Sequence, residues 1–251
     1  YYCDSAGSWG AAGRPRTRYV AIKTVEQQVL STQHRLREAL VGHRTQTINR
    51  IHGFLLEFGI ALPATKAAMN QIHQILDDPV AELPQQLKCD IEYLLEEIKR
   101  LTGEIKAIDR SIKEQVAADD AGTRLMSIPG IGPIIASALL ADIGDASNFH
   151  SARDFAASLG LVPRQYSTGD QTVLLNISKR GDKYLRKLLV QGSRAVLVRI
   201  DKRNDALGRW CRDLLARKHP NKVACALANK LARIVWAVLA RGGSYNAQLV
   251  T

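Results

Sequence analysis

The longest regular pattern of apolar positions in the chain lies between residues 87 and 112. Apolar residues recur there at alternating intervals of four and three: Leu87, Ile91, Leu94, Ile98, Leu101, Ile105, Ile108 and Ile112. This spacing is a heptad seam held for more than three heptads, and it predicts a long helix whose apolar edge needs a partner. Either an earlier helix of the chain or a second subunit can supply it. We favour an antiparallel hairpin within the chain because the connection is short.

The helix expected to pair with this seam spans residues 24–58. Thr24 and Gln27 have the spacing of a capping box, and Gly59 with Pro63 ends the helical pattern. Its apolar positions fall on one broad stripe: Val25, Val29, Leu36, Leu40, Ile48, Ile51, Leu55 and Phe58. A linker is expected at 118–122, after the heptad helix.

A turn rich in Pro and Gly then separates two apolar segments. Pro133 follows Gly130, Ile131 and Gly132, and proline is favoured in the first turn of a helix. Residues 124–144 are therefore expected to form a helix-hairpin-helix module, in which both glycines can take positive φ. The backbone N–H groups of residues 130–132 would bind a phosphate at the helix N-terminus, without reading bases. A helical hairpin that only builds the core is the structural alternative.

The rest of the chain also reads as helical. Ser151 is expected to cap a short helix that ends at Gly160, and 161–177 is expected to be a loop with a short extended piece. Three helices follow, at 182–200, 205–218 and 221–240. The predicted fold is all-α, divided into an irregular lead-in (1–23), a helical coiled-coil segment (24–120) and a C-terminal helical domain (121–251).

Charge is distributed unevenly along the chain. The net charge is +11, yet residues 151–251 carry 19 Lys and Arg against 6 Asp and Glu, while the first 150 residues carry 16 against 18. A basic half of this kind favours an anionic partner such as nucleic acid, because each neutralised phosphate releases counter-ions.

Other classes of function find little support. There is no phosphate-binding Walker loop, dinucleotide fingerprint or zinc-protease motif, and neither a signal peptide nor a membrane-spanning segment is visible. The cysteines show no metal-ligand spacing and are expected to be reduced thiols of a cytoplasmic protein: Cys3, Cys89, Cys211 and Cys225. Three histidines nine residues apart are expected on the solvated surface rather than at a metal: His34, His43 and His52.

One stretch carries residues suited to phosphoryl transfer. Ser167 offers a hydroxyl, and three cations near it in the sequence can hold a scissile phosphate: Arg164, Lys179 and Arg180. Three more cations on the next helix are expected to contact DNA: Lys183, Arg186 and Lys187. The structural alternative is that the serine only caps a turn.

These residues also carry a family resemblance. The C-terminal domain of the insertion-sequence 110/1111 transposases resembles two stretches of this chain: SIPGIGPIIASALLADIG and FAASLGLVPRQYSTGDQTVLLNISKRGDKYLRKLLVQGSRAV. The segment that precedes that domain resembles RYVAIKTVEQQVLSTQHRLREALVGHRTQTINRIHGFLLEFGIALP. The resemblance implies a DNA transposase whose serine nucleophile attacks a DNA phosphodiester. That serine maps onto Ser167, or onto Thr168 by a shift of one residue.

The resemblance implies partners and a cofactor as well. It implies DNA, an element-encoded guide RNA, a homo-oligomer and a nucleoid-associated location. An N-terminal RuvC-like domain would bind Mg²⁺ through an Asp-Glu-Asp-Asp set. Three of these acids would precede Tyr1, and Asp4 is the candidate for the fourth, so a truncated copy is expected. The alternative function is a non-catalytic helix-hairpin-helix DNA-binding protein that oligomerises through its coiled coil.

Overall fold

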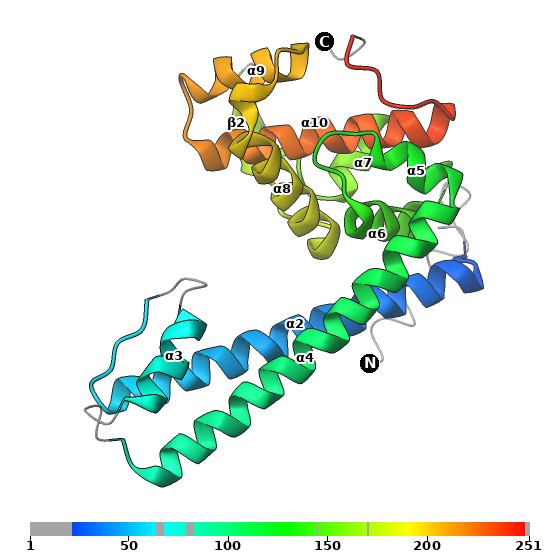
Figure 1. Cartoon of the computed structure of the whole chain (residues 1–251). Coiled ribbons are helices and arrows are strands. Elements are labelled where there is room, and N and C mark those ends of the chain that lie inside the picture. Colours follow the sequence, from blue (N-terminus) through cyan, green and yellow to red (C-terminus); the bar gives the residue numbers. More distant parts are fainter. Residues whose placement is uncertain (1–21, 64–67, 79–82, 145, 170, 249–251) are drawn as a thin grey trace, which may run out of the picture.

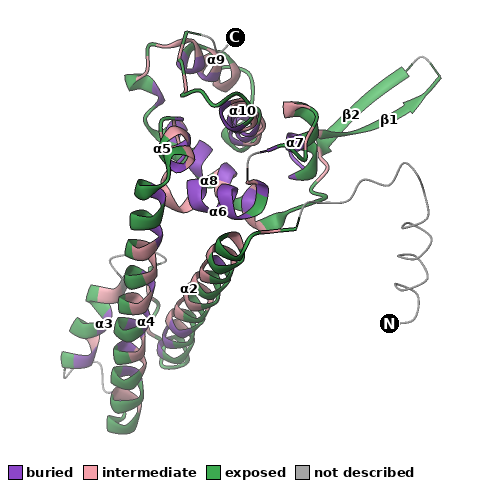
Figure 2. Cartoon of the chain, turned by 90° about the vertical axis from the view of Figure 1, so that its right-hand side faces the viewer, coloured by how far each residue is buried: buried purple, intermediate pink, exposed green. Residues whose placement is uncertain are grey.

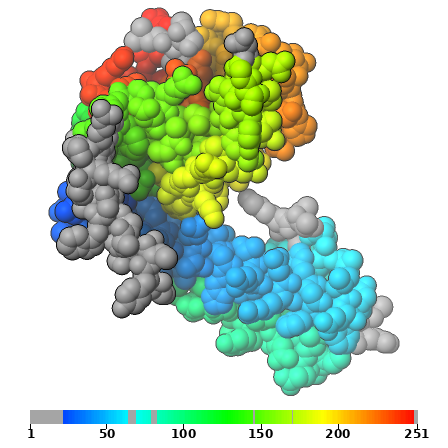
Figure 3. Space-filling model, turned by 180° about the vertical axis from the view of Figure 1, so that it is seen from behind, coloured from blue at the N-terminus to red at the C-terminus, as the bar shows by residue number. Residues whose placement is uncertain are grey.

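The computed structural model describes residues 22–63, 68–78, 83–144, 146–169 and 171–248, and these residues form a mostly helical fold (Figure 1). The expected helical class is confirmed, with a two-stranded sheet added. The elements follow in this order: α2 (Val25–Glu57), α3 (Ala68–Asp77), α4 (Gln85–Ala118), α5 (Asp120–Met126), α6 (Pro133–Ile143), α7 (Ala152–Ser158), β1 (Pro163–Thr168), β2 (Gln171–Ile177), α8 (Lys183–Val198), η2 (Ile200–Lys202), α9 (Ala206–Leu215) and α10 (Pro220–Arg241). A hairpin of long helices projects from a C-terminal lobe (Figure 3).

The two longest helices, α2 and α4, lie side by side and run in opposite directions, so the antiparallel hairpin within the chain is confirmed (Figure 1). The far end of the hairpin has its own hydrophobic core, to which α2, α3 and α4 contribute. This core consists of Ile51, Leu55, Ile72, Leu76, Leu83, Ile91, Leu95 and Ile98. The heptad pattern is correct for most of α4, but Leu95 is buried where the pattern placed Leu94.

The apolar stripe expected on α2 is wrong in its first half. Thr24 and Gln27 form the predicted capping box, but Val25 and Leu36 are 71% and 52% exposed. This half of α2 packs against α6, where Gln27 Nε2 donates a hydrogen bond to the carbonyl oxygen of Leu140 (3.1 Å). Hydrogen bonds to another part of the fold therefore help to hold the start of α2, and apolar periodicity does not reveal them.

The linker expected at 118–122 is wrong, because the helix is interrupted at one residue only. α4 ends at Ala118 and α5 begins at Asp120. Between them, Asp119 has an extended backbone, and its carboxylate accepts a hydrogen bond from the Ala121 N–H (3.0 Å). A capped corner of one residue is enough to turn the chain into the C-terminal lobe.

The C-terminal lobe is built around α10, which packs against α7 and α8. The predicted apolar face of α10 is confirmed as buried: Val223, Leu227, Leu231, Val235 and Val238. By length and composition α10 could also cross a membrane, with a mean hydropathy of 1.6, but half of that window is buried inside the protein. In this fold α10 therefore serves as a core helix.

The turn between α5 and α6 is tightly packed. Gly130 has a φ of +84°, as expected, but Gly132 has a φ of −98°, so the expectation of positive φ at both glycines is wrong. An added Cβ at Gly130 would lie 2.7 Å from the carbonyl oxygen of Gly192 on α8, and one at Gly192 would lie 2.3 Å from that of Gly130. The two glycines thus allow α8 to pack directly on the turn.

This contact predicts unequal effects of alanine at the two glycines of the turn. Gly130→Ala is expected to lower the free energy of unfolding by about 2–3 kcal/mol, because it adds both a strained φ and a backbone clash. Gly132→Ala is the matched control, since nothing lies within 4 Å of its Cβ position, and it should cost less than about 1 kcal/mol. Urea unfolding of both variants measures the difference, and equal losses would contradict the packing role.

Candidate nucleophile and nucleic-acid interface

The segment predicted as a loop at 161–177 is a two-stranded antiparallel ribbon that projects from the lobe (Figure 2). Thr168 pairs with Gln171 across the tip of the ribbon, and Gly169, which follows Thr168, has a φ of +60°. The short extended piece expected there is confirmed within β2, whereas the loop expected around it is wrong. A Gly-Asp pair between runs rich in Thr, Val and Tyr is a hairpin signal that could have revealed the ribbon.

The base of the ribbon is fixed to the end of α7 by backbone hydrogen bonds. The N–H of Lys179 donates to the carbonyl oxygen of Gly160 (3.0 Å), and the N–H of Ser178 donates to that of Val162 (2.8 Å). Ser151 caps α7 as predicted, through the N–H of residue 154. The ribbon therefore projects from a rigid attachment.

The pairing of the ribbon separates the two candidate nucleophiles. Ser167 pairs with Thr172 near the tip, and its Oγ accepts a hydrogen bond from Gln165 Nε2 (2.7 Å) on the same face of β1. Thr168 is the next residue along the strand, so its side chain points to the opposite face. Both residues are exposed. Ser167 and Thr168 therefore cannot substitute for each other at one phosphate without turning the ribbon over.

The six cations proposed from the sequence fall into two groups. Four are exposed at the ribbon or at the start of α8: Arg164, Lys179, Arg180 and Lys183. The side chains of the other two already interact with residues of the same chain. Arg186 donates to the carbonyl oxygen of Leu159 (2.8 Å), and Lys187 pairs with Glu38 of α2 and lies 5.2 Å from the ring centre of Tyr184. The last two therefore already connect parts of the fold.

The glycine turn is only half accessible. Ile131 is buried, and its N–H donates to the carbonyl oxygen of Ile128 (3.0 Å) within the turn. Pro129 and Gly130 nevertheless line a cavity of about 640 Å³ that is also lined by Arg199, Lys202 and Arg203. Sequence reasoning did not select these three cations, because only the packing of α8 and the segment after it brings them to the turn.

The expectation that His34 lies on the solvated surface is wrong. Its side chain is buried, and its ring lies between the hairpin and the lobe, with Nε2 2.7 Å from Ser137 Oγ and Nδ1 2.9 Å from the Tyr184 hydroxyl. The Ser137 hydroxyl donates to the carbonyl oxygen of Ile134, so its oxygen accepts a hydrogen bond from the Nε2–H of a neutral ring. The Tyr184 hydroxyl then donates to Nδ1. His43 is exposed, as expected.

Burial lowers the pKa of His34 to about 4, with a further contribution from the nearby charge of Arg37. Because the folded state disfavours the proton, His34 supports folding above its ordinary pKa of about 6.5, and this support is lost as the pH falls towards 4. We expect the wild type to lose about 2 kcal/mol more than His34→Gln between pH 7 and pH 5. Urea unfolding at both pH values measures this, and parallel losses would contradict it.

The described residues contain no cluster suited to binding a metal ion and no activated thiol. In the described parts of the chain no three His, Cys, Asp or Glu residues are grouped to hold a metal ion, and Asp4 lies outside them. The described residues do not fit the Mg²⁺ that the resemblance implies. The described cysteines are free thiols, and burial raises the pKa of Cys211 to about 11. Cys3 also lies outside the described residues.

Comparison with known proteins places this arrangement in a family. The model of the transposase IS116/IS110/IS902 family matches residues 122–208, which include the glycine turn, the ribbon and α8. The chain is 44% identical to the transposase for insertion sequence element IS1328 of Yersinia enterocolitica, over 96% of this chain and 72% of that protein.

Two further relatives agree. A probable family 20 transposase of Pseudomonas aeruginosa is 46% identical over 96% of this chain and 72% of its own length. The transposase for insertion sequence element IS1111A of Coxiella burnetii is 37% identical over 94% of this chain and 65% of its own length. On these similarities, the chain belongs to the IS116/IS110/IS902 family of insertion-sequence transposases.

Proposed function

We propose that this chain binds DNA and that the Ser167 hydroxyl becomes joined to a DNA strand during transposition. The observation that carries the proposal is the exposed position of Ser167 near the tip of a projecting ribbon (Figure 2). The excess of Lys and Arg in the half of the chain that contains the ribbon supports an anionic partner.

The shape of the ribbon suits this task. A two-stranded β-ribbon is narrow enough to enter the major groove of DNA, where a residue at its tip comes close to the strand. Arg164 on the ribbon and Arg180 at its base are exposed and can bind phosphates of the strand that the ribbon contacts. Ser167 itself has no charge, so these cations would hold the strand in place.

The reaction conserves the number of phosphate esters. A new bond forms between Ser167 Oγ and phosphorus as one P–O bond of the strand breaks, the hydroxyl gives up its proton, and the departing strand oxygen takes up a proton. The amide of Gln165 donates to Oγ and so orients the hydroxyl, but it does not accept the proton. The covalent link keeps the energy of the broken ester for rejoining.

The proposal is tested by trapping the intermediate. The full chain is incubated with a nicked duplex from which the cleaved end diffuses away, in buffer with Mg²⁺, and the products are separated under denaturing conditions. We expect a protein–DNA adduct, and peptide mass spectrometry should find the nucleotide on the peptide that contains Ser167. A failure to form any adduct, or an adduct on another peptide, would contradict the proposal.

The alternative of a non-catalytic DNA-binding protein that oligomerises through its coiled coil gains no support from the hairpin. Its oligomerisation would need an open heptad seam, whereas α2 packs along α4 within the chain. Ile91, Leu101 and Ile112 of the seam are fully buried there.

A further inference from the structure

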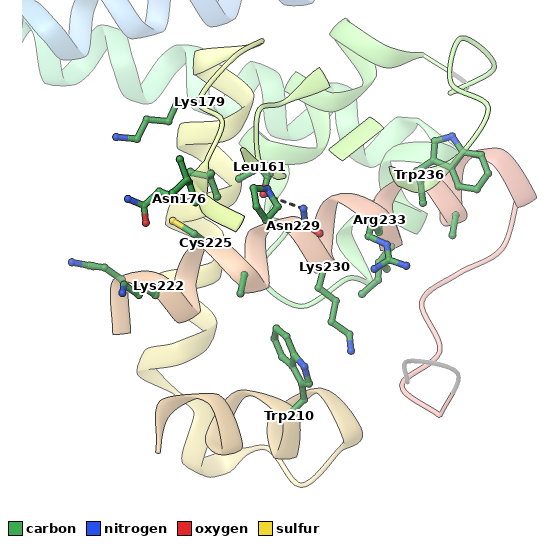
Figure 4. A pocket seen from close by; sticks show the side chains of 18 of the residues that line it. Leu161, Asn176, Lys179, Trp210, Lys222, Cys225, Asn229, Lys230, Arg233 and Trp236 are labelled. Atoms are coloured by element: carbon green, nitrogen blue, oxygen red, sulfur yellow. Dashed lines mark hydrogen bonds between the residues drawn. The ribbon is translucent and has the colours of Figure 1, made fainter. Parts of the chain in front are cut away.

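A large groove among the described residues runs along α10, between the base of the ribbon and α9 (Figure 4). Its volume is about 1020 Å³. Trp210 of α9 and Trp236 of α10 both line it, each of them half-buried. The groove thus combines aromatic surface with access from solvent.

Charge in the groove has one sign. The ionisable residues that line it, apart from Cys225, are all cations: Lys179, Lys222, Lys230, Arg233 and Arg241. None of the lining residues is Asp or Glu. Lys230 Nζ lies 4.8 Å from the ring centre of Trp210, so a cation and an aromatic ring lie next to each other in the groove. Phosphates are the anions that such cations bind in a nucleic-acid partner.

The groove also offers groups that can bind base edges. Asn176, Asn221 and Asn229 line it. The side-chain N–H of Asn229 donates to the carbonyl oxygen of Leu161 (3.1 Å), which fixes the amide and leaves its oxygen as an acceptor (Figure 4). The Trp236 indole N–H donates to the carbonyl oxygen of Phe149 (3.2 Å), which fixes that ring as well.

We propose that this groove binds a short segment of single-stranded DNA, with bases against the indole rings and phosphates against the cations. In intact duplex the base faces are stacked on one another, so they cannot meet an indole; unpaired bases can. The indole rings suit the face of an unpaired base, the amide groups suit its edge, and the cations suit the phosphate. The proposal rests on the proposed function only in taking DNA as the polymer.

The groove lies next to the base of the ribbon that carries Ser167, so binding there would bring a strand close to the proposed nucleophile. Pro163 and Ile177 pair at the base of the ribbon, and both line the groove. Ser167 lies four residues further along β1, a distance of roughly 13 Å for an extended strand. A DNA strand held in the groove would therefore be separated from its complementary strand near the point where the Ser167 hydroxyl acts.

The binding test uses the full chain and a fluorescein-labelled oligothymidylate of twelve nucleotides, followed by fluorescence anisotropy. Trp210→Leu is expected to weaken binding roughly tenfold, since stacking of a base on an aromatic side chain has about this effect, and Trp210→Phe should restore most of it. Thermal unfolding shows whether each variant is folded. Trp236→Leu provides a second, independent loss in case Trp210→Leu does not fold.

Matched charge variants test whether binding depends on the charges of the groove or only on the net charge of the protein. Lys222→Gln with Arg233→Gln removes two charges from the groove, and Lys99→Gln with Lys106→Gln removes two from the exposed surface of α4. We expect the first pair to weaken binding at least fivefold more than the second. Equal losses would mean that only net charge matters and would overturn the proposal.

Alkylation of cysteines locates the bound strand. Cys225 lines the groove, whereas Cys89 on α4 is exposed and remote from it. Oligothymidylate should slow the alkylation of Cys225 and leave that of Cys89 unchanged. Equal rates at Cys225 with and without DNA, or tighter binding of duplex or of a matched oligouridylate, would overturn the assignment to single-stranded DNA. None of these readouts uses Ser167, so they can fail while adduct formation succeeds.

Discussion

Ser167→Ala is expected to reduce the yield of the covalent protein–DNA adduct at least about a thousandfold, because it removes the nucleophilic oxygen itself. Thr168→Ala is expected to change the yield by no more than a few fold. The two residues are neighbours on β1 and point to opposite faces of the ribbon. A phosphate within reach of one hydroxyl is therefore out of reach of the other.

The two variants control for each other. Each removes a hydroxyl from an exposed position near the ribbon tip, so neither should alter the unfolding midpoint much. DNA affinity, measured by anisotropy, should stay close to that of the wild type in both. If Thr168→Ala abolished the adduct and Ser167→Ala did not, the nucleophile would lie on the other face of the ribbon, and the role given to Ser167 would be wrong.

Gly181→Ala is expected to lower the free energy of unfolding by about 3–5 kcal/mol. Gly181 has a φ of +97°, and a Cβ there would lie 1.8 Å from the carbonyl oxygen of Ser158 at the end of α7. The facing segment repeats the pattern, because a Cβ at Gly160 would lie 2.0 Å from the carbonyl oxygen of Arg180. Two backbone segments cross here with no room for side chains, and this crossing fixes the base of the ribbon.

Gly169→Ala is the matched control for this prediction. Gly169 also has a positive φ, +60°, but nothing lies within 4 Å of its Cβ position at the ribbon tip. It should therefore cost only the conformational strain, about 1 kcal/mol. Urea unfolding compares the two variants. If both lost the same stability, strain alone would explain the effect, and the crossing would not matter.

Local sequence patterns were enough to predict the helical framework. The heptad spacing of α4, the Thr24–Gln27 capping box and the apolar face of α10 each depend on residues close together in the chain. The last two are confirmed, and the heptad spacing is confirmed for most of α4. The intrachain hairpin was favoured over a second subunit because the connection is short, and the structure confirms it. Family membership came from the same local stretches and agrees with the comparisons.

Several features depended on contacts between residues far apart in the chain, so only the tertiary structure decided them. His34 is buried because α6 and α8 supply Ser137 and Tyr184 as partners. Gly130 faces Gly192 across 62 positions of sequence. The run at 173–175 is apolar, and its exposure depends on the ribbon leaving the lobe rather than on its composition.

The sequence by itself determined which segments are helical and to which family the chain belongs, because both depend on the order of neighbouring residues. The tertiary structure decided which cations are accessible, which face of the ribbon carries Ser167 and that the two tryptophans line one groove. These features depend on the packing of α8 and α9 against α10 and on the position of the ribbon base beside the groove. Packing of this kind follows from shape and hydrogen bonding across the whole lobe, which no local pattern contains.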